Sequence, residues 1–359
     1  MKRAIHQLVA GFNSGDAISN EALVLRGIFR EWGHESEIFC DPNFVRPEMR
    51  HETRDMHTLE TAAKADDTVL LHLSIGCGAN DLFPALRNRK AILYHNVTPA
   101  HFFRAVNPQI AASLERGRRQ IAQLAGCAEI NMAVSRFNAG ELEAAGYRDV
   151  KVLPLLIEFN LLKNASDRRT RRRYGDGKTN ILFVGRGAPN KKIEDVILAF
   201  HHFHRFVDPN SRLIHAGSFA GTERYHHVLR AMVREFKMDA DVIFTKTVTQ
   251  PELNALYQTA DLFLCMSEHE GFCIPVLESM LHDVPVMAYG AAALPETLDG
   301  AGVLFHEKQH DAIAEMMGRI IHDRALRQAV VKGQRQRLQR YQGLDLATEL
   351  RQLLRPLLA

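Results

Sequence analysis

Residues 261–298 constrain the fold of this chain more than any other stretch. They begin with a short apolar run, 261–266, of the kind that forms a buried strand in a parallel sheet. A polar loop ending at Gly271 follows, and Pro275 fits the first turn of a helix, where its missing N–H costs nothing. Pro285 then begins another strand. This order of strand, loop, helix and strand predicts a parallel α/β fold.

Two carboxylates, Glu270 and Glu278, bracket the start of the predicted helix. The unpaired N–H groups near Cys273 and Ile274 favour an anion such as a phosphate. Carboxylates beside such a site repel a bare phosphate, but they accept hydrogen bonds from vicinal hydroxyl groups. Phosphate and hydroxyls together indicate a nucleotide sugar. A loop glutamate and a solvated helix glutamate would give the same spacing, so the spacing alone leaves both interpretations open.

The same residues resemble a known motif. Glu270 and Glu278, with seven residues between them that include Gly-Phe-Cys-Ile-Pro, are similar to the central motif of retaining GT-B glycosyltransferases of family 4 (glycosyl transferases group 1, bacterial polysaccharide type). The resemblance covers nearly the whole chain. It is strong over 181–200 and 261–298 and weak in the first domain. It implies an α/β, GT-B architecture, in which two doubly wound Rossmann-like domains face each other across a cleft.

The length also favours two domains, because 359 residues exceed one ordinary core. Apolar runs alternate with helical patterns through 1–160 and restart at 180, after the polar, Arg-rich stretch 161–179. We therefore predict an N-terminal, acceptor-side domain, a linker, and a nucleotide-sugar-binding domain over 180–340. The resemblance implies that the amphipathic segment 341–359 is a helix that packs back on the first domain.

The first domain opens with an apolar run, a loop containing Gly15, and a helix over 22–32. The loop lacks the third glycine of a dinucleotide fingerprint. Gly15 could let the backbone approach a diphosphate or an acceptor, and a tight turn is the alternative. A further helix is expected over 54–65, and a strand over 150–156 closes the domain.

Polar side chains also stand at strand ends of the first domain. His72 and Ser74 end one predicted strand, and His95 follows the next. Ligands of open α/β sheets bind beyond the carboxyl ends of their strands, so all three are candidates. A histidine at a strand end is also commonly just hydrogen-bonded in place.

Arg186 and Lys191 are two cations on one strand-end loop that begins at Gly185. A leaving nucleoside diphosphate gains negative charge as the glycosidic bond breaks, and fixed cations stabilise that charge. Arginine can grip the phosphate with two hydrogen bonds, and lysine acts as a point charge. A solvated basic loop is the alternative. Lys192 is the fallback if the register differs by one residue.

The resemblance implies a role for each matching residue. Arg186 and Lys191 bind the diphosphate, Glu270 contacts sugar hydroxyls, and Glu278 binds the ribose. His95 meets the sugar from the first domain. The remaining implied donor-binding residues are Gly15, Asp16, Gly185, Lys192, Gly271, Phe272, Cys273 and Ile274.

The resemblance further implies transfer with retention at the anomeric carbon, without a metal or cofactor. No Asp-x-Asp metal motif is convincing, since Asp239-Ala-Asp241 precedes a strand and is typical of a turn. The chain departs from the family pattern in three loops: at 12–16, at Thr245-Lys246 and at 290–296. These departures concern phosphate and base contacts.

A net charge of +3 does not indicate a nucleic-acid partner. No apolar run approaches the roughly 18 residues that span a bilayer. The five cysteines are odd in number and show no metal spacing, which favours a reduced, cytoplasmic setting. Two arginine clusters are compatible with a solvated face or with an anionic inner-membrane surface. They comprise Arg116, Arg118 and Arg119, and Arg168, Arg169, Arg171, Arg172 and Arg173.

The resemblance therefore implies a hexosyltransferase of cell-surface polysaccharide synthesis. Its expected donor is a nucleotide sugar, with GDP-mannose as the lead, and its acceptor is a glycan or a polyprenyl-diphosphate-linked glycan. A nucleotide-sugar epimerase or a phosphorylase on the same fold is one alternative. A non-catalytic scaffold that binds nucleotide sugar is another.

Overall fold

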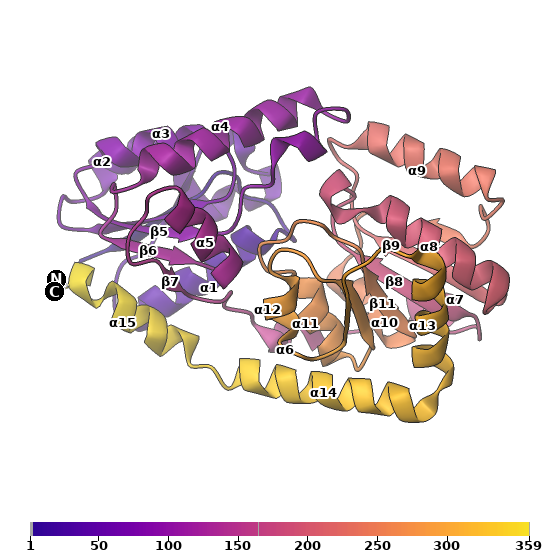
Figure 1. Ribbon diagram of the computed structural model, residues 1–359. Coiled ribbons are helices and arrows are strands. Elements are labelled where there is room, and N and C mark those ends of the chain that lie inside the picture. The colour runs from indigo at the N-terminus through magenta and orange to yellow at the C-terminus, as the bar shows by residue number, and fades with distance from the viewer. Residues whose placement is uncertain (1–2, 164, 359) are drawn as a thin grey trace. The chain divides into compact units, whose positions relative to one another are not determined.

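The computed structural model describes residues 3–163 and 165–358 (Figure 1). The chain divides into two compact units, each built on a parallel β-sheet. The described residues of the N-terminal unit are 3–101, 109–158 and 345–358, and those of the C-terminal unit are 102–108, 159–163 and 165–344.

The sheet of the N-terminal unit has the strand order β3-β2-β1-β4-β5-β6-β7 among the described residues. Its strands are β1 (Ile5–Leu8), β2 (Ile38–Cys40), β3 (Thr53–Asp55), β4 (Thr68–Leu73), β5 (Arg89–Tyr94), β6 (Ile130–Ala133) and β7 (Lys151–Val152). Its helices are α1 (Ala17–Glu31), α2 (Leu59–Ala62), α3 (Gly78–Leu82), α4 (Pro108–Leu124), α5 (Arg136–Ala144) and α15 (Leu346–Leu358).

The sheet of the C-terminal unit has the order β10-β9-β8-β11-β12-β13. Its strands are β8 (Thr179–Val184), β9 (Ser211–Ala216), β10 (Val242–Phe244), β11 (Leu262–Cys265), β12 (Val286–Tyr289) and β13 (Val303–Phe305). Its helices are α6 (Phe159–Lys163), α7 (Arg168–Tyr174), α8 (Ile193–Phe206), α9 (Glu223–Glu235), α10 (Gln250–Thr259), α11 (Ile274–Leu281), α12 (Leu294–Leu298), α13 (His310–His322) and α14 (Arg324–Gln342).

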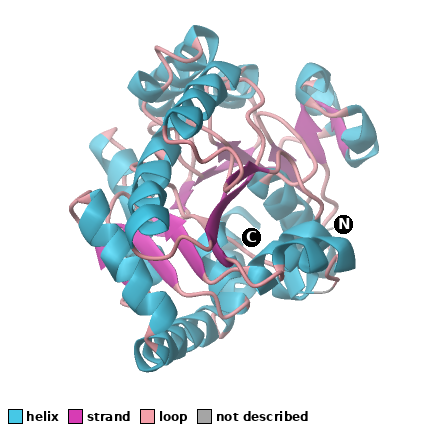
Figure 2. Ribbon diagram, turned by 90° about the vertical axis from the view of Figure 1, so that its right-hand side faces the viewer, coloured by secondary structure: helices cyan, strands magenta, loops and turns pink. Residues whose placement is uncertain are grey.

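Both sheets are doubly wound, as predicted. Every registered strand pair is parallel, and helices flank the strands (Figure 2). All six residues of β4 and of β9 are buried, and four of the six in β4 are apolar, as is typical of a central parallel strand. The strand order reverses between β1 and β4 in one unit and between β8 and β11 in the other. Such a reversal is where ligands bind in open α/β sheets.

The segment 54–65 differs from its prediction as one helix. It forms β3, a 3₁₀ turn and only four residues of helix α2. The Asp55 carboxylate accepts a hydrogen bond from the N–H of His57, and the Thr58 hydroxyl donates to the Asp55 carbonyl. Such local bonds compete with a helix. Pairing of β3 with β2 then extends the edge of the sheet.

The segment 161–179 was predicted to be a linker, and much of it is structured. Asp167 caps α7 by accepting from the N–H of Thr170, and its own N–H donates to the carbonyl of Pro251. These bonds attach the segment to the C-terminal unit. The strand expected over 150–156 is reduced to β7.

The last helix, α15, belongs to the N-terminal unit. Its leucines 350, 354 and 357 are fully buried. The guanidinium of Arg89 in β5 donates to the carbonyl of Pro356, and Arg351 lies over the ring of Trp32. Across residues 3–163 and 165–358, no helix has the length and apolar character needed to cross a membrane.

Candidate functional site

The candidate site of the C-terminal unit lies where β8 and β11 end. The two strands are neighbours, with Leu262 opposite Ile181 and Phe263 opposite Leu182. Loop 185–192 follows the carboxyl end of β8 and loop 266–273 that of β11, so both loops lie at the reversal of strand order. This position follows from the topology and coincides with the predicted residues.

Asn190 joins the two loops. Its carbonyl accepts a hydrogen bond from the N–H of Glu268 at 2.9 Å, and its side-chain amide donates to the carbonyl of His269 at 2.9 Å. Asn190 is itself buried. These two bonds also bring together Lys191, which follows Asn190, and Glu270, which follows His269. The ammonium of Lys191 lies 2.5 Å from a carboxylate oxygen of Glu270.

The Lys191–Glu270 pair is largely withdrawn from solvent. The side chain of Lys191 is 21% exposed and that of Glu270 is 8% exposed. Burial by itself lowers the pKa of Lys191, but Glu270 and the neighbouring thiols raise it more, so the net shift is upward. The lysine is therefore a fixed cation, and an anionic ligand that binds it must compete with Glu270.

The other two cations of the first loop have different partners. Arg186 is exposed and donates to the carbonyl of Ala220 at 3.0 Å. Lys192 lies in the left-handed region at φ 51°, and its ammonium is 3.5 Å from Glu268 and 3.6 Å from Glu194. Lys191, and not the fallback Lys192, therefore contacts Glu270.

The second carboxylate, Glu278, lies in α11. It is buried and accepts a hydrogen bond from the hydroxyl of Tyr257 at 2.7 Å. Burial raises the pKa of Glu278, with the Tyr257 bond acting in the opposite direction. The N-cap of α11 is Cys273, at φ 78°, and the Phe272 carbonyl accepts from the Thr297 hydroxyl. The predicted ribose contact of Glu278 stays a prediction.

The first loop of the N-terminal unit lies at the reversal between β1 and β4. Gly15 has φ 76°, and a side chain added there would meet nothing within 4 Å, so open space lies beside it. The carboxylate of Asp16 caps α1 by accepting from the N–H and the hydroxyl of Ser19. The helix therefore begins at Ala17, earlier than predicted. Contacts of Gly15 and Asp16 with a ligand stay predictions.

His95 and His72 belong to a buried chain of polar groups. The Nε2 of His72 is 2.9 Å from Oε1 of Gln7, and its Nδ1 is 2.9 Å from Nε2 of His95. The Nδ1 of His95 in turn faces Oε2 of Glu21 at 3.4 Å. All four side chains are at most 9% exposed.

The hydrogen-bond partners determine where the protons lie. Because the carbonyl oxygen of Gln7 only accepts, His72 donates through Nε2 and accepts through Nδ1. His95 then donates through Nε2, so its Nδ1 carries a lone pair that faces Oε2 of Glu21 at 3.4 Å without a hydrogen bond. Burial raises the pKa of Glu21 to about 8 and lowers that of His72 to about 3, in agreement with a neutral network. A sugar contact by the His95 ring requires displacement of one partner and stays a prediction.

Several of these residues were not found from the sequence. Glu21 had a usable signal, because it shares one helical stripe with Leu25 and Phe29, which are both fully buried. A carboxylate on an apolar stripe indicates a buried, partnered acid. Asn190 and Tyr257 had no comparable signal, since a loop amide and a helical tyrosine are common.

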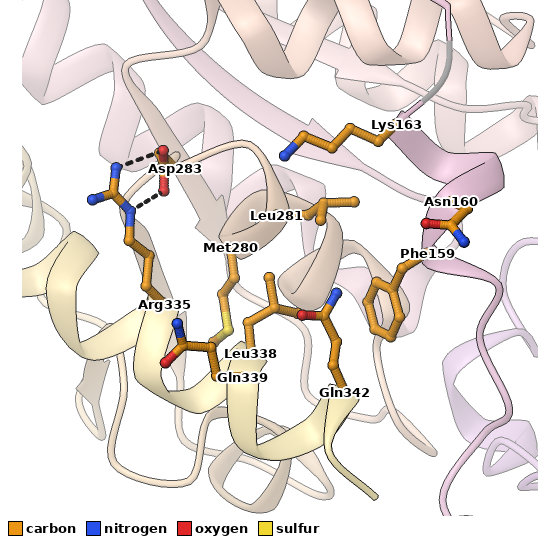
Figure 3. A pocket seen from close by; sticks show the side chains of 10 residues that line it. All are labelled: Phe159, Asn160, Lys163, Met280, Leu281, Asp283, Arg335, Leu338, Gln339 and Gln342. Atoms are coloured by element: carbon orange, nitrogen blue, oxygen red, sulfur yellow. Dashed lines mark hydrogen bonds and ion pairs between the residues drawn. The ribbon is translucent and has the colours of Figure 1, made fainter. Parts of the chain in front are cut away.

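A pocket of about 720 Å³ lies elsewhere in the C-terminal unit. It is formed between α6, the end of α11 at Met280 and Leu281, and α14 (Figure 3). Inside it the guanidinium of Arg335 makes two hydrogen bonds to Asp283, at 2.7 and 2.8 Å. None of the predicted site residues lines this pocket. Its position at the opposite end of α11 from Cys273 separates it from the Lys191–Glu270 pair.

Comparisons with known proteins bear on the family and the fold. Residues 166–337 match the family model described as Glycosyl transferases group 1. Sucrose-phosphate synthase from Thermosynechococcus elongatus superposes with a TM-score of 0.77 at 18% identity, covering 99% of each chain. The fold is GT-B.

Two relatives resemble part of this GT-B chain in sequence. O-antigen chain mannosyltransferase B of Escherichia coli is 28% identical over 147 residues, which are 41% of this chain and 38% of that protein. GDP-mannose:cellobiosyl-diphosphopolyprenol alpha-mannosyltransferase of Xanthomonas oryzae pv. oryzae is 32% identical over 149 residues, 39% of this chain and 37% of that protein. The matched segment thus spans less than two-fifths of either relative. Together the comparisons support a GT-B glycosyltransferase.

The raised pKa of Glu21 predicts how the free energy of unfolding depends on pH. Folded Glu21 holds its proton up to a pKa of about 8, whereas the unfolded carboxyl releases it near 4.5. The stability that this group contributes is therefore complete below pH 4.5 and is lost as pH rises to 8. Glu21 alone should lower the free energy of unfolding by about 1.4 kcal/mol per pH unit between pH 5.5 and 7, whereas the buried histidines, whose pKa values are lowered, contribute with the opposite sign.

Urea unfolding followed by fluorescence measures this slope, because the single tryptophan, Trp32, lies in the N-terminal unit. Across pH 5.5–7, the slope for Glu21→Gln should be more positive than that of the wild type by about 1.4 kcal/mol per pH unit. Glu31→Gln, a change to an exposed carboxylate of the same helix, should have the wild-type slope. Equal slopes for the wild type and Glu21→Gln would show that Glu21 is ionised in the folded protein.

Proposed function

We propose that this protein is a retaining glycosyltransferase of family 4, which moves a hexose from a nucleoside diphosphate sugar to a glycan or a lipid-linked acceptor. The observation that carries the proposal is the Lys191–Glu270 pair. It lies at the strand-order reversal of the C-terminal unit, within the region matched by the glycosyltransferase family model.

The chemistry of the pair suits such a donor. The Lys191 ammonium is a fixed positive charge that can neutralise a departing diphosphate, and Arg186 on the same loop adds a second. Glu270 then becomes free to accept hydrogen bonds from sugar hydroxyls. The buried Glu278, oriented by Tyr257, is proposed to bind the ribose. Gly185, Gly271 and Phe272 supply backbone contacts in the same two loops.

Retention without a metal completes the proposal. The acceptor attacks on the face that the diphosphate leaves, and a phosphate oxygen takes the acceptor proton. GDP-mannose is the proposed donor and a polyprenyl-diphosphate-linked glycan the proposed acceptor, since one relative bears both in its name and another is an O-antigen mannosyltransferase. This assigns the chain to cell-surface polysaccharide synthesis on the cytoplasmic side.

Transfer assays with purified protein test this function directly. Nucleotide sugars, GDP-mannose first, are incubated with a polyprenyl-diphosphate-linked glycan, and the product is analysed by NMR. The new linkage should keep the donor's anomeric configuration, and EDTA should leave the rate unchanged. Lys191→Ala and Glu270→Ala should each lower kcat by roughly 10²- to 10³-fold, whereas Lys192→Ala should change it only a few-fold.

Other outcomes favour the other candidate functions. An inverted product or a strict need for a divalent ion would contradict the proposed mechanism. Free epimerised nucleotide sugar formed without acceptor would indicate an epimerase, and transfer to inorganic phosphate a phosphorylase. If the in-cell glycan were unchanged in both Lys191→Ala and Glu270→Ala, a non-catalytic scaffold would be favoured.

We also propose that the arginines of α7 bind anionic membrane surfaces. All five, at 168, 169, 171, 172 and 173, are exposed. In the other cluster Arg116 is paired with Asp81, and Arg118 lies 2.7 Å from Glu141. These intramolecular pairs reduce the charge that α4 can offer a membrane, so α7 is the stronger candidate.

Sedimentation with vesicles tests the role of α7. Replacing its five arginines by glutamine should abolish binding to anionic vesicles at low salt, since each contributes about 1 kcal/mol near such a surface. Replacing Arg116 and Arg118 should have a small effect, and neutral vesicles should not bind. Failure of the wild type to sediment with anionic vesicles would contradict the proposal.

A further inference from the structure

Two cysteines that lie apart in the sequence meet beside the Lys191–Glu270 pair. Cys265 ends β11 and is fully buried, and Cys273 caps α11 and is half-buried. Both sulfur atoms and a carboxylate oxygen of Glu270 lie within 4.8 Å of one another. Sequence spacing did not indicate this cluster, because the folded loop brings the three groups together.

We propose that Cys265, Glu270 and Cys273 form a binding site for a thiophilic divalent cation such as Zn²⁺, and that the cation inhibits the protein. Zinc bound in a tetrahedron has Zn–S distances of about 2.3 Å and Zn–O distances of about 2.0–2.2 Å, so its ligand atoms stand about 3.5–3.8 Å apart. Ligand atoms already within 4.8 Å reach this geometry through side-chain shifts of about 1 Å. A water molecule takes the fourth position.

The backbone holds the ligands in place. The Glu270 carbonyl accepts from the N–H of Ala293, and the carbonyl of the preceding residue, His269, accepts from Asn190. The Cys265 sulfur lies 3.3 Å from the hydroxyl of Ser267. Cys273 keeps a left-handed backbone at φ 78° and ψ 68°, where glycine is favoured and other residues cost of order 1 kcal/mol. A thiol thus occupies a position where backbone preference alone favours glycine.

The two thiols lie close to each other. The Cys265 thiol donates a hydrogen bond to the Ser267 hydroxyl at 3.3 Å, and the Cys273 sulfur lies within 4.8 Å of the Cys265 sulfur. Binding of Zn²⁺ releases both thiol protons to solvent, so the two thiolates and the carboxylate carry a total charge of −3. The cation reduces this to −1, and the adjacent Lys191 ammonium compensates the remainder.

Inhibition follows because the cation occupies the Glu270 carboxylate. A Glu270 carboxylate that binds Zn²⁺ no longer accepts hydrogen bonds from sugar hydroxyls, and Lys191 stays beside it as counter-charge. This part of the inference rests on the proposed function. Mg²⁺ prefers oxygen ligands and keeps several waters, so it should not bind here.

The other group of possible ligands among the described residues is Glu21, His72 and His95. The facing nitrogens of the two histidines are 2.9 Å apart and directly hydrogen-bonded. Two nitrogen ligands of one zinc ion stand about 3.3 Å apart, each about 2.0–2.1 Å from the metal. The inserted ion would have to break that bond inside a fully packed interior, so the cysteine cluster is favoured.

Metal titration of the full chain under reducing conditions tests the site without any sugar donor. Zn²⁺ should bind at one equivalent. Cd²⁺ should produce the ultraviolet thiolate-to-metal charge-transfer band, which histidine and carboxylate ligands do not give. Cys273→Ser, which preserves a good N-cap, should weaken Zn²⁺ binding by more than the roughly 10–100-fold that loss of an outer-shell partner costs. Cys127→Ser, a change to a half-buried thiol of the N-terminal unit, should bind as the wild type does.

Retention of stoichiometric binding by Cys273→Ser, or the absence of the Cd²⁺ band, would place the metal on other residues such as His226 and His227 and overturn the proposal. A second arm compares transfer rates with and without one equivalent of Zn²⁺ in each variant. Inhibition should be strong in the wild type and in Cys127→Ser, and at least 10-fold weaker in Cys273→Ser. If the protein shows no transferase activity, the titration still decides whether the metal site exists. Binding without inhibition would overturn the regulatory part.

Discussion

The reversal of strand order between β8 and β11 is the constraint on which the site of the C-terminal unit depends. At a reversal the two crossover connections leave for opposite faces of the sheet, so the groups at both strand ends stay accessible. Asn190 then fixes the separation of the two loops through one backbone and one side-chain hydrogen bond. The contact between Lys191 and Glu270 is a consequence of that tie.

The Lys191–Glu270 pair is well suited to exchange its partners. Two charges taken out of water are costly unless each has a partner, and here each serves the other. A nucleoside diphosphate sugar offers a replacement for both at once, since its phosphates suit the ammonium and its hydroxyls suit the carboxylate. A simple phosphate replaces only one partner and leaves Glu270 uncompensated. The pair therefore favours a ligand that carries both chemistries.

Much of this arrangement could be predicted from the sequence, because long periodic segments carry strong signals. Strands β11 and β12 form where the apolar run 261–266 and Pro285 predict them, and the loop after β11 contains the predicted Glu270. The segments that differ are short or polar. Asp55 and Asp167 make side-chain bonds to nearby backbone groups, and those bonds decide the local structure where hydrophobic periodicity is weak.

Contacts between distant residues were harder to predict than secondary structure. The exposed or buried state of a histidine such as His95 depends on Glu21, His72 and Gln7, which come from three other elements. The meeting of Cys265 with Cys273 likewise depends on the path of the loop between them. Sequence spacing alone predicts neither the path of the loop between the two cysteines nor the hydrogen-bond partners of His95.

Hydrogen–deuterium exchange with a nucleoside diphosphate tests the central claim most directly, namely that the donor binds at the ends of β8 and β11. GDP and UDP are each added at about 100 times their dissociation constant, where a ligand contributes about 2.7 kcal/mol of stability. At least one of them should protect the amides of 185–193 and 266–276 and leave those of α13, 310–322, unchanged. Protection confined to the α6–α14 pocket, at 159–163 and 335–342, or no protection by either nucleotide, would contradict the account.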